Sequence, residues 1–218
     1  RVVSGGIFTP HGEKLTLVFP GNLGGATWSG AAFDPASGFL FVNVNELGAI
    51  GEMRKRPGAE GYRRGSDLPR GEYARFWDER RWPCQKPPWG TFTAVNLHDG
   101  SIAWRVPLGI VEELAAKGLR DTGSPNLGGA IVTAGGVVFI AGTNDRRLRA
   151  FDARTGSSLW ETTLPASGHA TPITYLGPQS GRQCVAIAAG GGGYLSPTYS
   201  DALVAFSLPA QDRRPAIR

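Results

Sequence analysis

The chain has 218 residues, a formal net charge of +5, 32 glycines, 16 prolines, six tryptophans and two cysteines. Its length suffices for one domain with a substantial core, and its glycine and proline content favours short strands joined by tight turns. No run of about 18 uncharged apolar residues occurs, which excludes a transmembrane helix in this span.

Short alternating or apolar runs bounded by turn residues predict an all-β chain. In chain order the expected strands span 15–19, 39–44, 91–96, 101–106, 130–133, 136–141, 148–152, 158–163, 171–175, 183–189 and 201–207. Residues 110–119 form the one helix-like segment. Between about 46 and 88 the periodicity gives way to charge, glycine and proline, which predicts a long surface loop excursion.

Two segments repeat the pattern Ala-x-Asn/Asp-x-x-x-Gly-Ser-x-x-Trp. They span residues 93–104 and 149–160, so Ala94 and Ala150 lie 56 positions apart. In each copy a strand enters a glycine turn and a second strand carries a tryptophan, as in the blades of a β-propeller. The glycines allow the positive φ of such turns, and Trp104 and Trp160 are large enough to fill the space between blades.

These units predict about three to four propeller blades over residues 1–208, and a basic Pro/Arg tail at 209–218 that is expected to be disordered. Three or four blades leave two open faces, so we expect part of a ring rather than a closed one. The first residue is Arg1 and the one methionine is at position 53, which favours a longer parent protein.

The charge pattern argues against nucleic-acid binding. The cations gather at 54–81, where they alternate with acidic residues as in a solvated loop, and at 213–218. Cys84 and Cys184 have no zinc-type spacing, and their pairing stays open.

Several longer motifs resemble the C-terminal part of the PQQ (pyrroloquinoline quinone) dependent dehydrogenases of the glucose/quinate branch. They include Pro-Gly-Asn-Leu-Gly-Gly at 20–25, Pro-Cys-Gln-Lys-Pro-Pro-Trp-Gly at 83–90 and Gly-Thr-Asn-Asp-Arg at 142–146. The resemblance implies blades of an eight-bladed propeller in a periplasmic oxidoreductase. Such an enzyme oxidises a sugar or polyol, holds PQQ with a divalent cation, usually calcium, and passes electrons to a quinone or another acceptor.

The resemblance also implies cofactor-binding residues, each of which has a structural alternative. The set is Asn22, Asn126, Asp145, Gly191 and Gly192. Asn22 and Asp145 could instead serve their own turns. Trp89 could cover the cofactor or pack between blades, and we favour packing; His169 is expected to be a packed imidazole.

Two features put limits on this assignment. Gly192 stands where the family commonly has a histidine near the cofactor, which removes a possible donor. The general base, the cation ligands and the remaining blades are expected outside this chain, so the catalytic residues are not assigned and the segment alone is expected to be inactive. The alternative is a non-catalytic propeller scaffold that binds envelope proteins.

Overall fold

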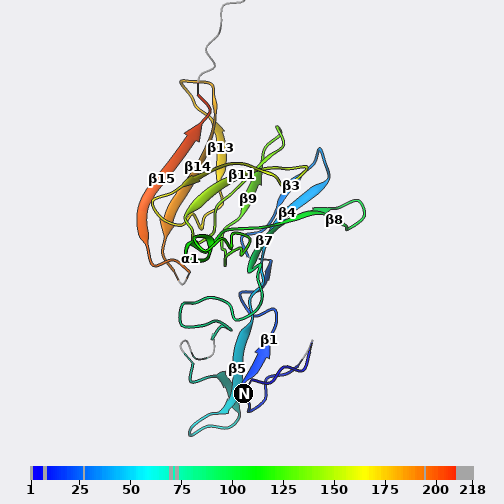
Figure 1. Cartoon of the computed structure of the whole chain (residues 1–218), viewed down its shortest axis with the longest axis vertical. Coiled ribbons are helices and arrows are strands. Elements are labelled where there is room, and N and C mark those ends of the chain that lie inside the picture. The colour runs from blue at the N-terminus through cyan, green and yellow to red at the C-terminus, as the bar shows by residue number, and fades with distance from the viewer. Residues whose placement is uncertain are drawn as a thin grey trace, which may run out of the picture.

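The computed structural model describes residues 2–6, 9–26, 28–68, 71, 74–193 and 195–209. Within these residues the fold is all-β, as predicted: the strands form four antiparallel sheets, accompanied by one short helix, α1 (Glu112–Ala115) (Figure 1). Most of the tail expected to be disordered, residues 210–218, lies outside the described residues.

Three of the sheets are propeller blades that stand side by side (Figure 1). The strands of blade 1 are β2 (Gly25–Ala26), β3 (Ala32–Asp34), β4 (Phe39–Asn45), β7 (Gly90–Asn96) and β8 (Ile102–Pro107). The strands of blade 2 are β9 (Ala130–Val132), β10 (Val137–Ile140), β11 (Arg147–Asp152) and β12 (Ser158–Thr163). The strands of blade 3 are β13 (Ile173–Leu176), β14 (Gln183–Gly191) and β15 (Tyr199–Ser207).

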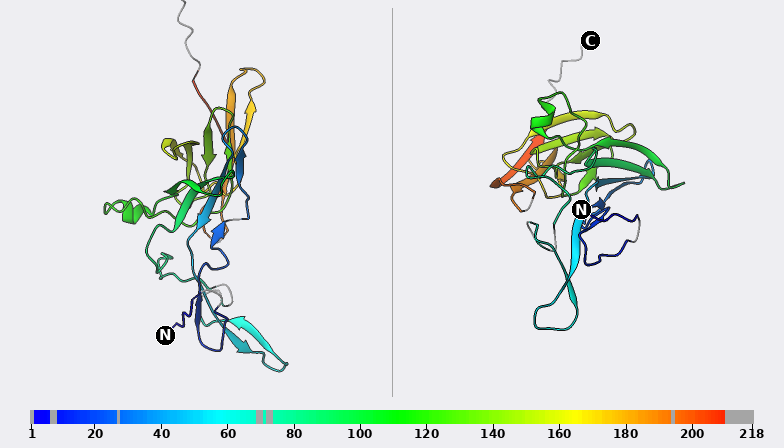
Figure 2. Two further views of the ribbon diagram at one scale, coloured as in Figure 1. Left: turned by 90° about the vertical axis from the view of Figure 1, so that its right-hand side faces the viewer. Right: turned by 60° about the horizontal axis from the view of Figure 1, so that its bottom comes forward.

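The fourth sheet, here called the arm, lies apart from the blades at the end of the molecule that carries β1 (Figures 1 and 2). It consists of β1 (Thr16–Val18), β5 (Ala49–Lys55) and β6 (Tyr62–Gly65), in the order β1-β5-β6. The excursion expected at 46–88 is therefore not all loop. Its strands escaped prediction because charged side chains occupy both faces of the β5–β6 hairpin, which hides the alternation of a half-buried strand.

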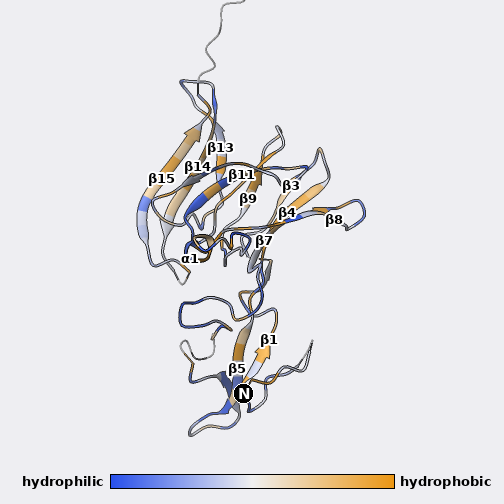
Figure 3. Cartoon of the chain, viewed as in Figure 1, coloured by the Kyte–Doolittle hydropathy of each residue, from blue (hydrophilic) through white to orange (hydrophobic). Residues whose placement is uncertain are grey.

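The hydrophobic core lies between the blades rather than inside them. One cluster joins blades 1 and 2 and includes the fully buried Phe41, Phe92 and Val138. A second cluster joins blades 2 and 3, where Leu148 and Ile187 are buried. In Figure 3 the apolar colour follows the blade strands, while the start of β11, which carries Arg147 and Arg149, is hydrophilic.

The repeated hairpins have the geometry that their sequence predicts. Gly100 and Gly156 have φ of 74° and 72°, and each hairpin has a register shift after its alanine, Ala94 or Ala150. A side chain at Gly156 would collide with the Trp104 ring of the preceding blade. The glycine thus serves both the turn and the blade contact.

Within the described residues the three blades do not close into a ring, in agreement with prediction. The outer face of blade 3 remains exposed: Ile173 is 60% and Leu203 75% accessible. Cys84 and Cys184 are both free. No helix in the described part of the chain is long and apolar enough to cross a membrane.

Candidate functional site

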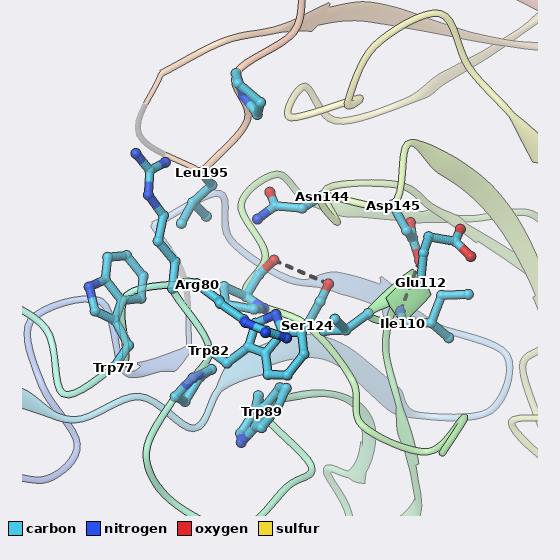
Figure 4. A pocket seen from close by; sticks show the side chains of 15 residues that line it. Trp77, Arg80, Trp82, Trp89, Ile110, Glu112, Ser124, Asn144, Asp145 and Leu195 are labelled. Carbon is cyan, nitrogen blue, oxygen red and sulfur yellow. Dashed lines mark hydrogen bonds between the residues drawn. The ribbon is translucent and has the colours of Figure 1, made fainter. Parts of the chain in front are cut away.

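A cavity of about 330 Å³ lies where the end of the 46–88 excursion meets blades 1 and 2 (Figure 4). Four stretches line most of it. They are residues 77 and 80–83 with Trp89, residues 110–112, residues 124–125, and residues 144–145. Leu195 and Pro197, from the loop between β14 and β15, complete the lining.

One side of the cavity is aromatic and cationic. The side chains of Trp77, Trp82 and Trp89 lie on that side in Figure 4, away from Asn144. The Trp89 indole is 5% exposed and donates its Nε1–H to the Gln85 carbonyl oxygen at 2.8 Å. The guanidinium of Arg80 lies over the Trp82 ring, 5.2 Å from the centroid, a cation–π distance.

This wall was missing from the sequence prediction, which treated the charged residues of 54–81 as a solvated loop. Backbone hydrogen bonds shape the segment, because Cys84 N–H donates to the Phe76 carbonyl and Trp89 N–H to that of Thr122. Trp89 was expected to pack, and it is both buried and part of the lining. Three tryptophans within 13 residues were the one available signal.

The polar side of the cavity is built on the Asp145 carboxylate, whose side chain is fully buried. One carboxylate oxygen, Oδ2, accepts from the Ile110 amide at 2.9 Å and from Arg149 Nη2 at 2.5 Å. The other, Oδ1, accepts from the Thr143 hydroxyl at 2.5 Å and from the Arg147 amide at 3.1 Å. The carboxylate therefore ties the β10–β11 turn to the segment before α1.

Burial of the Asp145 carboxyl group opposes its ionisation. The hydrogen bonds and the charge of Arg149, with help from Thr143 and the Ile110 amide, outweigh this cost and hold the pKa of Asp145 below its ordinary value. The group is thus a carboxylate at neutral pH with its acceptor positions filled. It is suited to hold structure in place rather than to accept a proton.

Beside it, Asn144 is another polar residue of the lining. Its Oδ1 is buried and has no hydrogen-bond partner among the described residues. An unpaired buried acceptor costs stability, so such an atom is typical of a site that a ligand completes. Sequence reasoning chose Asp145 and passed over this neighbour.

Asn126 lies outside the cavity lining and is fully buried. Its Oδ1 accepts from Asn43 Nδ2 at 2.6 Å, its backbone amide donates to Asn45 Oδ1 at 2.8 Å, and its carbonyl accepts from Asn45 Nδ2 at 2.8 Å. These bonds form a clasp, the asparagine clasp, between β4 and the segment that leads into blade 2. The clasp supports the adjacent Ser124 and Pro125, which do line the cavity.

The remaining predicted residues also lie outside the lining. Asn22 is exposed, and its Oδ1 accepts from Arg75 Nη1 at 2.6 Å. Gly191 and Gly192 have φ of 59° and 70°, and their amides donate to the carbonyls of Ser167 and Thr198. Of the five predicted residues, the structure brings Asp145 alone to the cavity.

His169 is half-buried, and its Nε2 has no partner in the described part of the chain. Burial lowers the pKa of this imidazole, so it is neutral at physiological pH. It does not line the cavity, and its packing agrees with the structural interpretation of this residue.

Comparison with known proteins decides the family. A family model described as "PQQ: Glucose/ethanol/alcohol dehydrogenase, beta-propeller domain" matches residues 1–185. The chain belongs to this PQQ dehydrogenase family. Its blades are consequently blades of the propeller of this family, whose model names PQQ.

Individual relatives of this chain carry the names of dehydrogenases. It is 41% identical over 227 residues to a probable quinate dehydrogenase (quinone) of Xanthomonas campestris pv. juglandis, with 94% of this chain and 28% of that protein covered. It is 37% identical over 233 residues to a glycerol dehydrogenase large subunit of Gluconobacter oxydans, with 94% and 31% covered. The chain thus spans less than a third of either relative's length.

Among solved structures, the chain is similar to the quinohemoprotein alcohol dehydrogenase from Comamonas testosteroni. The TM-score is 0.61 at 25% sequence identity, over 90% of this chain and 28% of that one. The likeness agrees with an incomplete propeller.

Proposed function

We propose that the cavity is part of the PQQ pocket of a dehydrogenase that oxidises a hydroxyl group of a sugar or polyol. The observation that carries the proposal is a tryptophan-walled cavity with arginine side chains and an unpaired buried amide oxygen, Asn144 Oδ1, in the described residues. PQQ is a flat quinone with carboxylate groups, so aromatic faces and guanidinium donors suit it. When bound, the cofactor supplies the acceptor for the two electrons of the alcohol.

The residues of the cavity would hold the cofactor in three ways. Trp77, Trp82 and Trp89 would contact its ring faces and exclude water. Arg80 and Arg81, which line the same side, would face its carboxylates. Asn144 Oδ1 would accept a hydrogen bond from a ring N–H group.

For the five residues predicted from the sequence we propose different roles. Asn22 lies outside the cavity lining, so its exposed side-chain amide nitrogen would contact the cofactor only where the pocket continues beyond this cavity. Asn126 and Asp145 have their polar atoms engaged, so they would shape the pocket rather than touch the cofactor. Gly191 and Gly192 would admit a close approach of the backbone.

The proton acceptor and the cation are proposed to come from other parts of the protein. Glu112 and Asp145, the carboxylates of the lining, are paired with Arg147 and Arg149. Among the described residues no group of three or more His, Cys, Asp or Glu side chains could hold a metal ion. We therefore propose that a divalent cation, calcium, is held mostly by further blades, and that residues 1–218 alone are inactive.

The proposed setting is the periplasm, with electrons passing to a quinone or another acceptor. Its support is the family, together with relatives whose names specify a quinone, as in the Xanthomonas protein. Dye reduction with glucose, glycerol and quinate distinguishes a sugar from a polyol substrate.

A titration with PQQ and calcium chloride tests the proposal on two samples: residues 1–218, and the protein as its gene encodes it. Binding is followed by cofactor absorbance, and turnover by dye reduction with glucose, glycerol and quinate. We expect binding and turnover only for the gene-encoded protein. Turnover by residues 1–218 would contradict the assignment of base and cation to other blades, and absence of binding by both samples would favour a scaffold.

A further inference from the structure

Arg149 does not line the cavity, yet it contacts both oxygens of the Asp145 carboxylate, which does. Its side chain is 7% exposed, and it donates from Nη1 and Nη2 to both oxygens of Asp145. Nη1 also donates to the Thr143 hydroxyl at 3.1 Å. A guanidinium that grips a carboxylate by both oxygens fixes its orientation as well as its charge.

The Asp145 carboxylate in turn holds the part of the cavity wall formed by residues 110–112. Oδ2 faces Arg149 on one side and accepts the Ile110 amide on the other. Ile110, Val111 and Glu112 line the cavity, and Glu112 is held in addition by Arg147 at 2.6 Å. Both of these anchors end on arginines of β11, and a further bond joins the Val111 amide to the Thr122 hydroxyl at 3.3 Å.

The charges around this group leave Arg149 as its principal counterion. Arg147 Nη1 is 3.8 Å from Asp145 Oδ2, but it also serves Glu112. Glu161 of β12 lies 3.5 Å from the Nε atoms of both arginines, so its carboxylate forms ion pairs with the same two cations. Without Arg149 the buried carboxylate would lack adequate compensation and would take up a proton, because burial disfavours its ionised form.

We propose that Arg149 is a positioning residue for the cofactor pocket: through the Asp145 carboxylate it holds the Ile110–Glu112 wall in the shape that receives the ligand. The expected effect of Arg149 on PQQ binding rests on the proposed function, whereas its effect on the shape of the Ile110–Glu112 wall does not.

Hydrogen exchange of the Ile110 amide tests the wall directly, in the gene-encoded protein without added cofactor. Exchange is followed by mass spectrometry on peptides that cover residues 108–116. In Arg149→Met we expect the amide to exchange about tenfold faster or more, because its acceptor is no longer a fixed carboxylate. Arg149→Lys keeps the charge without the two-pronged grip, so its rate should be intermediate.

Two controls separate this effect from general loosening. In the first, Arg105→Met removes an exposed arginine of β8, and the Ile110 amide of this variant should exchange at the wild-type rate. In the second, peptides covering 91–96 report the core of blade 1, and in Arg149→Met they should exchange as in the wild type. Should Arg149→Met unfold, the double variant Arg149→Met/Asp145→Asn removes the uncompensated charge and allows the same measurement.

PQQ titration of the same variants then tests the pocket. We expect the dissociation constant to rise about tenfold or more in Arg149→Met and to recover in part in Arg149→Lys. Unchanged exchange at Ile110 would overturn the proposal. Fast exchange at Ile110 together with unaltered PQQ affinity would overturn its link to the pocket, and no PQQ binding by the wild type would refute the proposed function instead.

Discussion

The indole of Trp104 donates its Nε1–H to the carbonyl oxygen of Ala153, 2.9 Å away in the next blade. The bond joins β8 of blade 1 to the hairpin of blade 2, and the ring itself is 9% exposed among the residues between the two blades. Trp160, its counterpart in the repeat, contacts Phe206 of blade 3 with ring centroids 5.2 Å apart and remains 38% exposed. The tryptophan of the repeat is thus buried more deeply between blades 1 and 2 than between blades 2 and 3.

Trp104→Ala should therefore lower the free energy of unfolding more than Trp160→Ala. For Trp104 we expect a loss of about 3–5 kcal/mol, since a large aromatic ring and a buried hydrogen bond are removed together. Urea unfolding of the gene-encoded protein measures both variants. Equal losses would mean that burial between blades does not govern stability here.

The asparagine clasp predicts that removing the side-chain amide of Asn126 lowers the stability more than removing that of Asn144. Asn126→Ala removes the side-chain oxygen that accepts from the buried Asn43 amide, whereas the backbone bonds to Asn45 remain, and this loss should cost about 1–3 kcal/mol of stability. Asn144→Ala removes an acceptor that has no partner in the described residues, so its stability should change little or rise. Thermal unfolding compares the two, and a larger loss for Asn144→Ala would contradict the clasp.

The Asp145 carboxylate predicts a pH dependence of stability. Because its pKa is lowered in the folded state, its contribution is present above the unfolded pKa of about 4 and is lost as pH falls through the folded value. Arg149, Arg147, Glu112 and Glu161 are the charged groups around it. The difference in unfolding free energy between wild type and Asp145→Asn should be largest near pH 7 and shrink towards pH 3.

Asp99→Asn provides the comparison for this experiment. The pKa of Asp99 is also lowered, by hydrogen bonds from Ser101, but the group is exposed to solvent. Its pH-dependent contribution should be smaller because water screens it. A difference for Asp145→Asn that does not vary with pH would show that the carboxylate is not ionised as described.

The aromatic wall predicts that Trp82→Ala weakens PQQ binding about tenfold, through loss of a stacking surface and of the Arg80 contact. Trp28→Ala is the matched control, because Trp28 is 90% exposed and lies outside the cavity lining. Quenching of tryptophan fluorescence by the cofactor gives both dissociation constants. Equal affinities for the two variants would remove Trp82 from the site.

The blades could be predicted because their determinants are local. Gly156 and Trp104 belong to a repeat whose turn and strand read directly from adjacent residues, and both behave as expected. The cavity could not be predicted from the sequence, because Trp82, Ser124 and Asn144 come from three distant parts of the chain and meet only when the blades have packed.

The surroundings of Asn126 show what the sequence could have revealed about a predicted cofactor residue. Its side-chain Oδ1 accepts from Asn43, and its backbone amide donates to Asn45. A signal for this was available in β4, where asparagines at positions 43 and 45 share one face of an otherwise apolar strand. Two buried amides on one face require polar partners, and Asn126 is that partner.

Because the hydrophobic clusters lie between the blades, blade 2 contributes residues to two different cores, one shared with blade 1 and one shared with blade 3. Recombination between homologous genes that exchanges the whole of blade 2 would split both cores at once and mismatch the side chains of Phe41 and Val138 on one face and of Leu148 and Ile187 on the other. Chimaeras that keep facing half-blades together would preserve these contacts. An exchange that preserves packing must therefore keep the contact between two blades intact, rather than the single blade.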